Sequence, residues 1–203
     1  MFQKATSADP EFSRAWASLA LAHAYSVLLH GSGDADMRIA DEASRRAIAL
    51  DPELADGHVA RIVVCAAESR GAEAEAAFRK AVELDPDNYE AYYHFGRYMF
   101  KQGDFERVIE LWERAREIDP DDYQTPTISM SVYEQVGDKD KLLQAAKDGA
   151  RAASLYVEQH PEDARAWMLG AHAYLGLGER DRAMQFAEAA LQAEPDSEGT
   201  HYN

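Results

Sequence analysis

Cysteine is almost absent from this sequence, since Cys65 is the only one among 203 residues. No disulfide can therefore form within the chain, and a reducing compartment is favoured. The sequence shows no signal-peptide pattern and no apolar run near the roughly 20 residues that a membrane-spanning helix needs. We expect a soluble, cytoplasmic protein that does not enter a membrane.

Residues that interrupt helices are also scarce, with 7 prolines and 12 glycines. β-branched residues are sparse and alanine is frequent, a mixture that favours helix over strand. Hydrophobic residues make up 46% of the chain, which is enough to bury a core. The composition predicts an all-α protein.

Positive charge is in short supply: 21 Lys and Arg face 37 Asp and Glu, for a formal net charge of -16. Such a chain repels phosphate backbones and anionic lipids, so we expect no nucleic acid and no membrane surface as partners. A basic peptide or basic protein surface is the favoured partner. The acidic residues themselves are interpreted as solvated outer faces and helix-start charges.

Motifs that carry chemistry are missing as well. Gly31-Ser32-Gly33 lacks the rest of any phosphate-binding fingerprint, and the scattered histidines form no His-x-x-x-His pair for a metal. Cys65 falls at a helix-packing position, which predicts a buried structural thiol. We therefore expect no enzyme activity, no cofactor and no metal site. Of the histidines, His23 and His58 fall at packing positions, whereas His94 and His172 are expected to be more exposed.

What the chain does contain is a repeat. An acidic or polar residue precedes a proline six times, and three of the five intervals between these prolines are 34 residues. Small residues recur upstream of each proline, large side chains recur between them, and a glycine falls seventeen residues after three of them. Small residues let antiparallel helices approach closely, glycine forms the turn inside a pair, and proline ends the second helix. A simple helical bundle has no reason to keep this register. The prolines are Pro10, Pro52, Pro86, Pro120, Pro161 and Pro195.

This pattern resembles the tetratricopeptide repeat (TPR) family over essentially the whole chain. The match is strongest from Tyr89 to Pro120 and weakest from Pro120 to Pro161. The resemblance implies an all-α fold, a right-handed α-solenoid of antiparallel helix pairs in a single array over residues 1–203. We expect about five repeats, at 13–52, 55–86, 89–120, 123–161 and 164–195, with partial repeats at 1–10 and 197–203.

Three departures from the regular spacing carry structural predictions. The first interval is eight residues too long around residues 30–34, which predicts a longer first helix and a looser turn, or a loop folded over the end of the groove. The fourth interval is seven residues too long, close to two helical turns, which predicts one continuous helix from Lys139 to about Gln159. Thr125 followed by Pro126 predicts a helix that starts late, with Thr125 as its N-cap.

The partial repeats at both ends indicate a segment of a longer protein, with apolar edges exposed beside the last one. Met184, Ala187 and Leu191 are expected in such an edge, which favours self-association. The resemblance also extends, less specifically, to TPR tails of bacterial signalling proteins, which follow a nucleotide cyclase, a Ser/Thr kinase or a DNA-binding regulator.

In the TPR family the first helix of each pair lines the concave surface, which implies a set of partner-binding residues here. The alternative, a solvated helix face with an aromatic packed on the next repeat, stays open. The basic clamp that some members use for a chaperone tail is absent, because Ala17 and Leu21 stand at its early positions. The expected partner-binding residues are Tyr93, Arg97, Phe100, Lys101, Glu134, Arg165, Met168 and His172. The earlier repeats offer mostly small apolar groups there, namely Ala17, Leu21, Ala24, Tyr25, Val59, Val63, Ala66 and Ala67.

The resemblance thus implies a non-catalytic scaffold that binds a peptide or protein segment in its concave groove. The alternative is a structural or self-assembling spacer within a larger regulatory protein.

Overall fold

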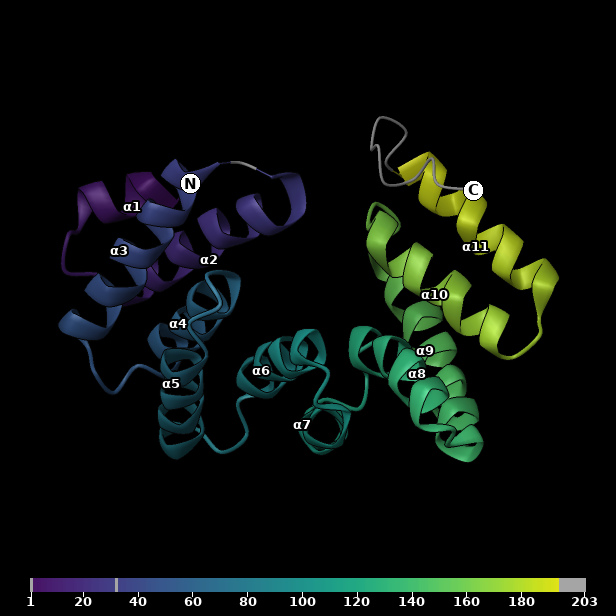
Figure 1. Cartoon of the computed structure of the whole chain (residues 1–203). Helices are drawn as coiled ribbons and strands as arrows, with labels where there is room; N and C mark the ends of the chain where they lie inside the picture. Colours follow the sequence, from purple (N-terminus) through teal and green to yellow (C-terminus); the bar gives the residue numbers. More distant parts are fainter. Residues whose placement is uncertain (1, 32, 194–203) are drawn as a thin grey trace. The chain divides into compact units, whose positions relative to one another are not determined.

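The computed structural model describes residues 2–31 and 33–193, and these form eleven α-helices (Figure 1). The all-α class is therefore confirmed. The partial repeat at 197–203 lies outside the described residues. No helix in the described ranges is both long and apolar enough to cross a membrane. In chain order the helices are α1 (Phe2–Ala8), α2 (Ser13–His30), α3 (Asp34–Leu50), α4 (Ala55–Ala67), α5 (Gly71–Leu84), α6 (Tyr89–Gln102), α7 (Phe105–Ile118), α8 (Gln124–Val136), α9 (Lys139–Gln159), α10 (Ala164–Gly176) and α11 (Arg180–Ala193).

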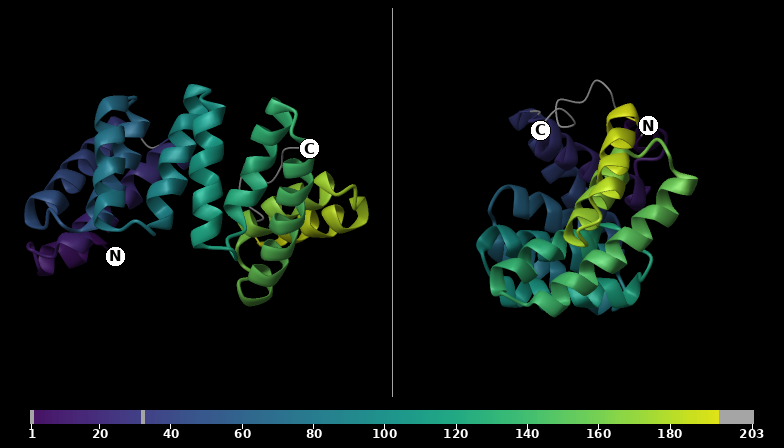
Figure 2. Two further views of the ribbon diagram at one scale, coloured as in Figure 1. Left: turned by 90° about the horizontal axis from the view of Figure 1, so that it is seen from below. Right: turned by 90° about the vertical axis from the view of Figure 1, so that its right-hand side faces the viewer.

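The chain divides into two compact units, residues 1–104 and 105–203, at the turn between α6 and α7. In unit 1, helix α2 pairs with α3 and α4 pairs with α5, while α4 also contacts α2 and α6 (Figure 2). In unit 2, α9 packs against both α8 and α10, and α10 pairs with α11. Unit 1 thus contains the helix pairs α2–α3 and α4–α5, and unit 2 contains α8–α9 and α10–α11.

Alanine dominates the core of unit 1, as the recurring small residues predict. Ala20, Ala43, Ala47 and Ala60 form one cluster between α2, α3 and α4, each at most 1% exposed. Without larger side chains between them, the helix axes can approach closely. Aromatic rings fill the next layer, where Phe78 of α5 stacks on Phe95 of α6 with ring centroids 4.5 Å apart.

The long first interval lengthens two helices. Helix α2 has 18 residues and α3 has 17, whereas α4 has 13 and α5 has 14. The predicted extension of the first helix is confirmed, and the second helix takes part of the excess as well. Gly31 ends α2 in the left-handed conformation, at φ 63°.

The turn inside the α4–α5 pair breaks the glycine pattern. Ser69 adopts a left-handed φ of 60° there, whereas Gly103, Gly137 and Gly178 occupy the equivalent turns at 77° to 78°. A side chain in this conformation costs about 1–2 kcal/mol through its Cβ, which glycine lacks. The α4–α5 turn is therefore strained where the others are relaxed.

The prediction of one continuous helix in the fourth interval is confirmed: α9 runs unbroken through 21 residues. Gly149 lies in its middle for a packing reason. A Cβ there would lie 2.4 Å from Thr127 Oγ1 of α8 and 3.4 Å from the Ala173 Cβ of α10. The glycine lets three helices meet.

The predicted start of α8 is wrong by about two residues. The helix begins at Gln124, with Tyr123 at the N-cap position, and Thr125 lies inside the first turn. The capping acceptor is the carboxylate of Asp122, which accepts from the backbone N–H of Gln124 at 2.9 Å and of Thr125 at 2.7 Å. A charged carboxylate is a strong acceptor at the positive end of a helix, so Asp122 supplies the cap that we assigned to Thr125.

Candidate functional site

The first helices of the pairs in unit 1, α2, α4 and α6, surround a hollow of about 100 Å³. It brings together six residues that the TPR resemblance places on the inner face and three that it missed. The expected ones are Tyr25, Val63, Ala66, Ala67, Arg97 and Lys101, and the missed ones are Leu28, His94 and Tyr98.

The missed residues follow from helical spacing. On α6 the lining positions 94, 97, 98 and 101 make one continuous stripe, and on α2 Leu28 lies one turn beyond Tyr25. Extending each inner position by three or four residues would have found all three.

The floor of the hollow is α4, which presents only small side chains there. Val63 is 5% exposed, and Ala66 and Ala67 are half-buried. Because nothing larger projects from α4, a side chain of α2 can reach one of α6 across it. The Tyr25 hydroxyl lies 2.9 Å from His94 Nε2, with the ring centroids 5.8 Å apart.

The expected exposure of His94 is wrong, since the residue is only 6% exposed. Its ring is held on several sides: Nε2 also lies 2.9 Å from the Glu90 carboxylate, and the ring of Tyr93 meets it edge-on at 5.0 Å. In helix α6 taken by itself, the side of the helix that carries His94 would be open to solvent. Tyr25 of α2 covers it. His172, on α10, is exposed as expected, while Cys65 is fully buried as expected.

Arg97 and Lys101 give the wall of the hollow a positive charge. The Arg97 guanidinium lies 5.7 Å from the ring centroid of Tyr93, and neither cation forms an ion pair within the part of the chain that the structure describes. Some other cations of unit 1 are paired, since Arg79 lies 2.7 Å from Glu75 and Lys80 lies 2.8 Å from Glu83. The hollow is therefore lined by two cations that lack an ion-pair partner among the described residues, in a chain that is acidic as a whole.

The hollow is small. Sites for cofactors and drug-sized ligands occupy roughly 300–1,000 Å³, several times the space here. The dimensions fit one side chain of a larger partner. In the described residues no group of three His, Cys, Asp or Glu is placed to hold a metal ion.

The other expected partner-binding residues lie elsewhere. Tyr93 is 3% exposed and stacks on Tyr89 at 5.6 Å, so it supports Arg97 from below. Phe100 is 41% exposed on α6 and does not line the hollow. The remaining four belong to unit 2: Glu134 is exposed on α8, while Arg165, Met168 and His172 form a row along α10 with Arg165 half-buried.

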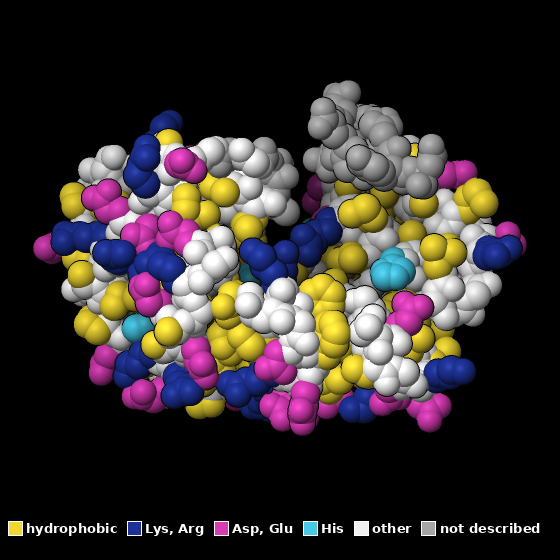
Figure 3. Space-filling view, in the orientation of Figure 1, with side chains coloured by type: hydrophobic (Ala, Val, Ile, Leu, Met, Phe, Trp, Pro, Cys, Tyr) yellow, Lys and Arg dark blue, Asp and Glu magenta, His cyan; other side chains and the backbone are white. Residues whose placement is uncertain are grey.

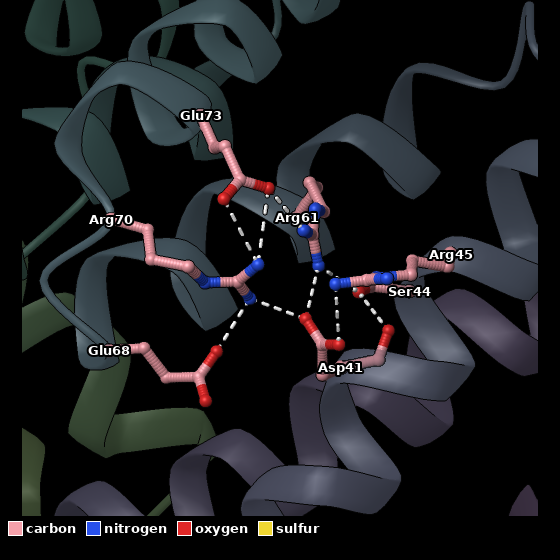
Figure 4. Close-up of polar contacts among 7 residues, drawn as sticks. All are labelled: Asp41, Ser44, Arg45, Arg61, Glu68, Arg70 and Glu73. Carbon is pink, nitrogen blue, oxygen red and sulfur yellow. Dashed lines mark hydrogen bonds and ion pairs between the residues drawn. The ribbon is translucent and has the colours of Figure 1, made fainter.

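An ion-pair cluster joins α3, α4 and α5 in the same unit (Figure 4). Asp41 of α3 accepts from Arg61 Nη1 of α4 at 2.5 Å and from Arg70 in the α4–α5 turn. Glu73 of α5 accepts from Arg61 Nη2 at 2.6 Å and Arg70 Nη1 at 3.1 Å, and Glu68 pairs with Arg70 at 2.5 Å. On the surface of this region, acidic and basic side chains lie interleaved (Figure 3).

The cluster alters the acidity of its members. Burial raises the pKa of Asp41, but hydrogen bonds and charge from Arg61 and Arg70 outweigh it and bring that pKa below its usual value. The hydrogen bond from Arg61 likewise lowers the pKa of Glu73. Reading the acidic residues as solvated outer faces is therefore wrong for Asp41, which fixes the second helix of one pair to the next pair.

Comparison with known proteins agrees with this architecture. Three tetratricopeptide repeat profiles match residues 35–89, 66–125 and 164–197, together more than half of the chain. Tetratricopeptide repeat protein 5 of Mus musculus is 30% identical over 106 residues, which are 52% of this chain. The chain spans about a quarter of the length of that curated relative (24%).

Two solved structures are similar over nearly the whole chain. YrrB, described as a TPR protein with an unusual peptide-binding site, has a TM-score of 0.52 at 20% identity, covering 98% of this chain and 95% of its own. PilW, described as a type IV pilus biogenesis factor, has a TM-score of 0.62 at 24% identity, covering 98% and 86%. At these identities the likeness shows the fold. None of these three relatives is described as the tail of a signalling protein.

The 34-residue proline spacing, the antiparallel helix pairs with alanine between them and the matching profiles all agree. The chain belongs to the tetratricopeptide repeat family.

Proposed function

We propose that this chain is a non-catalytic scaffold and that unit 1 binds a peptide or protein segment on the surface formed by α2, α4 and α6. TPR proteins typically mediate protein–protein interactions and are generally not enzymes. The observation that carries the proposal is the hollow over α4, with its apolar floor and two uncompensated cations. The description of YrrB as peptide-binding supports it.

The energetics of the surface suit a protein partner. Interface hot spots are enriched in arginine and tyrosine and sit beside pockets that exclude water. Arg97 and Tyr25 border such a pocket, and the bridge from Tyr25 to His94 holds its rim in place before a partner arrives. A surface shaped in advance loses less entropy on binding.

The proposal can be tested with a substitution that fills the hollow. Ala66→Leu places an isobutyl group on the floor, while Ala76→Leu, the same change on an exposed position of α5, serves as the control. Peptides selected on the wild-type protein from a random display library should bind the control equally and lose about tenfold in affinity or more with Ala66→Leu. Circular dichroism establishes that both variants are folded. Selected peptides that bind all three proteins alike, or a library that gives no binder, would contradict the proposal.

The first helices of unit 2 offer a second contact surface in the same proposal. Glu134 on α8 and Arg165, Met168 and His172 on α10 expose polar and apolar groups, and Met168 is 48% exposed. α8 and α10 contact each other, so their exposed faces are neighbours. Met168→Glu should weaken any partner that uses this surface, whereas a partner confined to unit 1 is unaffected.

Self-association is a second candidate function, favoured by α11. Met184 is 61% exposed and Leu191 is 40% exposed, seven residues apart on one face with exposed Ala187 between them. Hydrophobic side chains reach the surface over α10 and α11 (Figure 3). Light scattering coupled to size exclusion should give more than one chain per particle, and Met184→Glu with Leu191→Glu should restore a monomer. A strict monomer at high concentration would exclude this candidate.

A further inference from the structure

We infer that the segment held by unit 1 is acidic: it seats one apolar side chain in the hollow over α4 and places side-chain carboxylates against Arg97 and Lys101. This rests on the proposed function and specifies its partner. It reverses the expectation of a basic partner that the net charge of the whole chain suggests.

Two cations give the hollow its charge. Arg97 and Lys101 both line it and form no ion pair within the described ranges, whereas the Glu90 carboxylate, 2.9 Å from His94 Nε2, is not part of its lining. The carboxylate of Glu68, at the end of α4, also lies outside the lining and pairs with Arg70 at 2.5 Å. The charge left for a partner at this surface is positive.

Arg97 is held in place by its neighbours. Its guanidinium lies over the ring of Tyr93, which is itself 3% exposed and stacked on Tyr89 with an interplanar angle of 16°. A cation fixed on a buried aromatic platform loses little freedom when it pairs with a carboxylate. Tyr93 therefore acts through Arg97 and does not itself contact the partner.

The spacing of the two cations suits two separate carboxylates. Arg97 and Lys101 are one helical turn apart, about 6 Å along α6. A single terminal carboxylate is smaller than that separation, whereas acidic side chains two residues apart in an extended segment are about 7 Å apart. The arrangement therefore suits carboxylates on side chains within a chain better than the end of a chain.

The charge close to the contact outweighs the net charge of the whole chain. At physiological ionic strength charges are screened beyond about 8 Å, so most of the net charge of -16 acts weakly on a contact at hydrogen-bond distance. A partner carboxylate bound at Arg97 lies within hydrogen-bond distance of the guanidinium, and a charge-assisted hydrogen bond at that distance is strong. The positive charge at the hollow, and not the net negative charge of the chain, therefore decides which partner binds.

The residues at the floor of the hollow favour an apolar side chain in the partner. Val63, Ala66 and Ala67 offer no hydrogen-bonding side-chain atom, and about 100 Å³ of space lies above them. An aliphatic side chain fits that space and gains from leaving water, whereas a second charge there would lose its hydration.

The experiment sequences the peptides that the display library yields and then measures two charge variants. Arg97→Gln with Lys101→Gln removes both cations at the hollow, and Arg46→Gln with Lys80→Gln removes the same charge from α3 and α5 as a control. The selected peptides should carry an aliphatic residue beside Asp or Glu. They should bind the control like the wild type and lose about tenfold or more with the first pair. Added salt should weaken binding to the wild type more than to the first pair.

The outcomes separate the two proposals. Peptides that depend on Ala66 but are neutral or basic, or that bind both charge variants equally, would overturn the acidic partner and leave the peptide-binding proposal standing. An amidated peptide should bind as well as its free acid, and a requirement for the free acid would overturn the assignment to side chains. A short single-stranded oligonucleotide that displaces the peptide with higher affinity would overturn it in favour of nucleic acid.

Discussion

The Tyr25 hydroxyl on α2 and Nε2 of His94 on α6 lie 2.9 Å apart, although α4 runs between their helices. This contact exists because α4 carries Ala66 and Ala67 beneath it, so that no side chain separates the two rings. The contact between Tyr25 and His94 closes one border of the hollow, so that α2, α4 and α6 form one continuous surface.

Tyr25→Phe should therefore loosen unit 1 without changing its packing. The substitution removes the hydroxyl and keeps the ring, and a hydrogen bond of this kind contributes about 0.5–1.5 kcal/mol to the free energy of unfolding. Urea denaturation of the variant should show a loss in that range. Tyr92→Phe, which removes a hydroxyl 3.3 Å from the Pro86 carbonyl oxygen at a more exposed position, should lose less. Equal losses for both would mean that the bridge carries no particular stability.

Ser69→Gly should stabilise the protein. Ser69 holds a left-handed φ of 60° in the turn where other pairs have glycine. Glycine removes the Cβ strain of about 1–2 kcal/mol, but it also makes the unfolded chain more flexible, which offsets part of that stabilisation. We expect the free energy of unfolding to rise by about 0.5–1 kcal/mol. Denaturant unfolding measures the difference. Ser69→Ala keeps the Cβ and should bring no such gain, so a gain from alanine would point to a different cause.

Two glycines inside helices should respond oppositely to alanine. At Gly57 in α4 a new Cβ meets its nearest atom, Ile48 Cγ1, at an ordinary 3.5 Å, so the higher helix propensity of alanine should add about 0.5–1 kcal/mol. At Gly149 in α9 the Cβ would lie 2.4 Å from Thr127 Oγ1, which forces α8 and α9 apart at a cost of about 1–3 kcal/mol. Thermal unfolding of the pair gives the two signs. A stabilised Gly149→Ala protein would show that the helices separate without cost.

Stability should fall at acidic pH because of the cluster around Asp41. The pKa values of Asp41 and Glu73 are lower in the folded chain than their ordinary values of 3.8 and 4.5, through their hydrogen bonds with Arg61 and Arg70. Below those ordinary values the unfolded chain takes up protons that the folded chain does not, so the stabilisation present above about pH 5 is lost as the pH falls through the folded pKa values. Urea unfolding between about pH 6 and pH 3 measures this loss.

Asp41→Asn is the matched variant for the pH series. It cannot titrate at this position, so its unfolding free energy should depend less on pH over the same range, although it should be lower at neutral pH because Arg61 and Arg70 lose a charged partner. An unchanged pH dependence would mean that other carboxylates dominate acid unfolding.

The sequence by itself determined the repeating part of this protein. Proline spacing located the helix pairs, and the excess of seven residues in the fourth interval predicted α9 as one helix. The positions of Val63, Ala66, Arg97 and Lys101 on an inner face also followed from the resemblance, because each helix repeats the same pattern of buried and open positions. These properties belong to single helices, where periodicity suffices.

Contacts between helices were decided only by the tertiary structure. Nothing in the sequence shows that Tyr25 reaches His94 or that Asp41 reaches Arg61 and Arg70, because these depend on how far each helix slides and rotates against its neighbour. The same reason explains the errors at His94, expected exposed but buried, and at Asp41, read as solvated but paired. A side chain's charge and size can be read from the chain, but its partner is set by packing, and that packing brings two free cations to a hollow in an acidic protein.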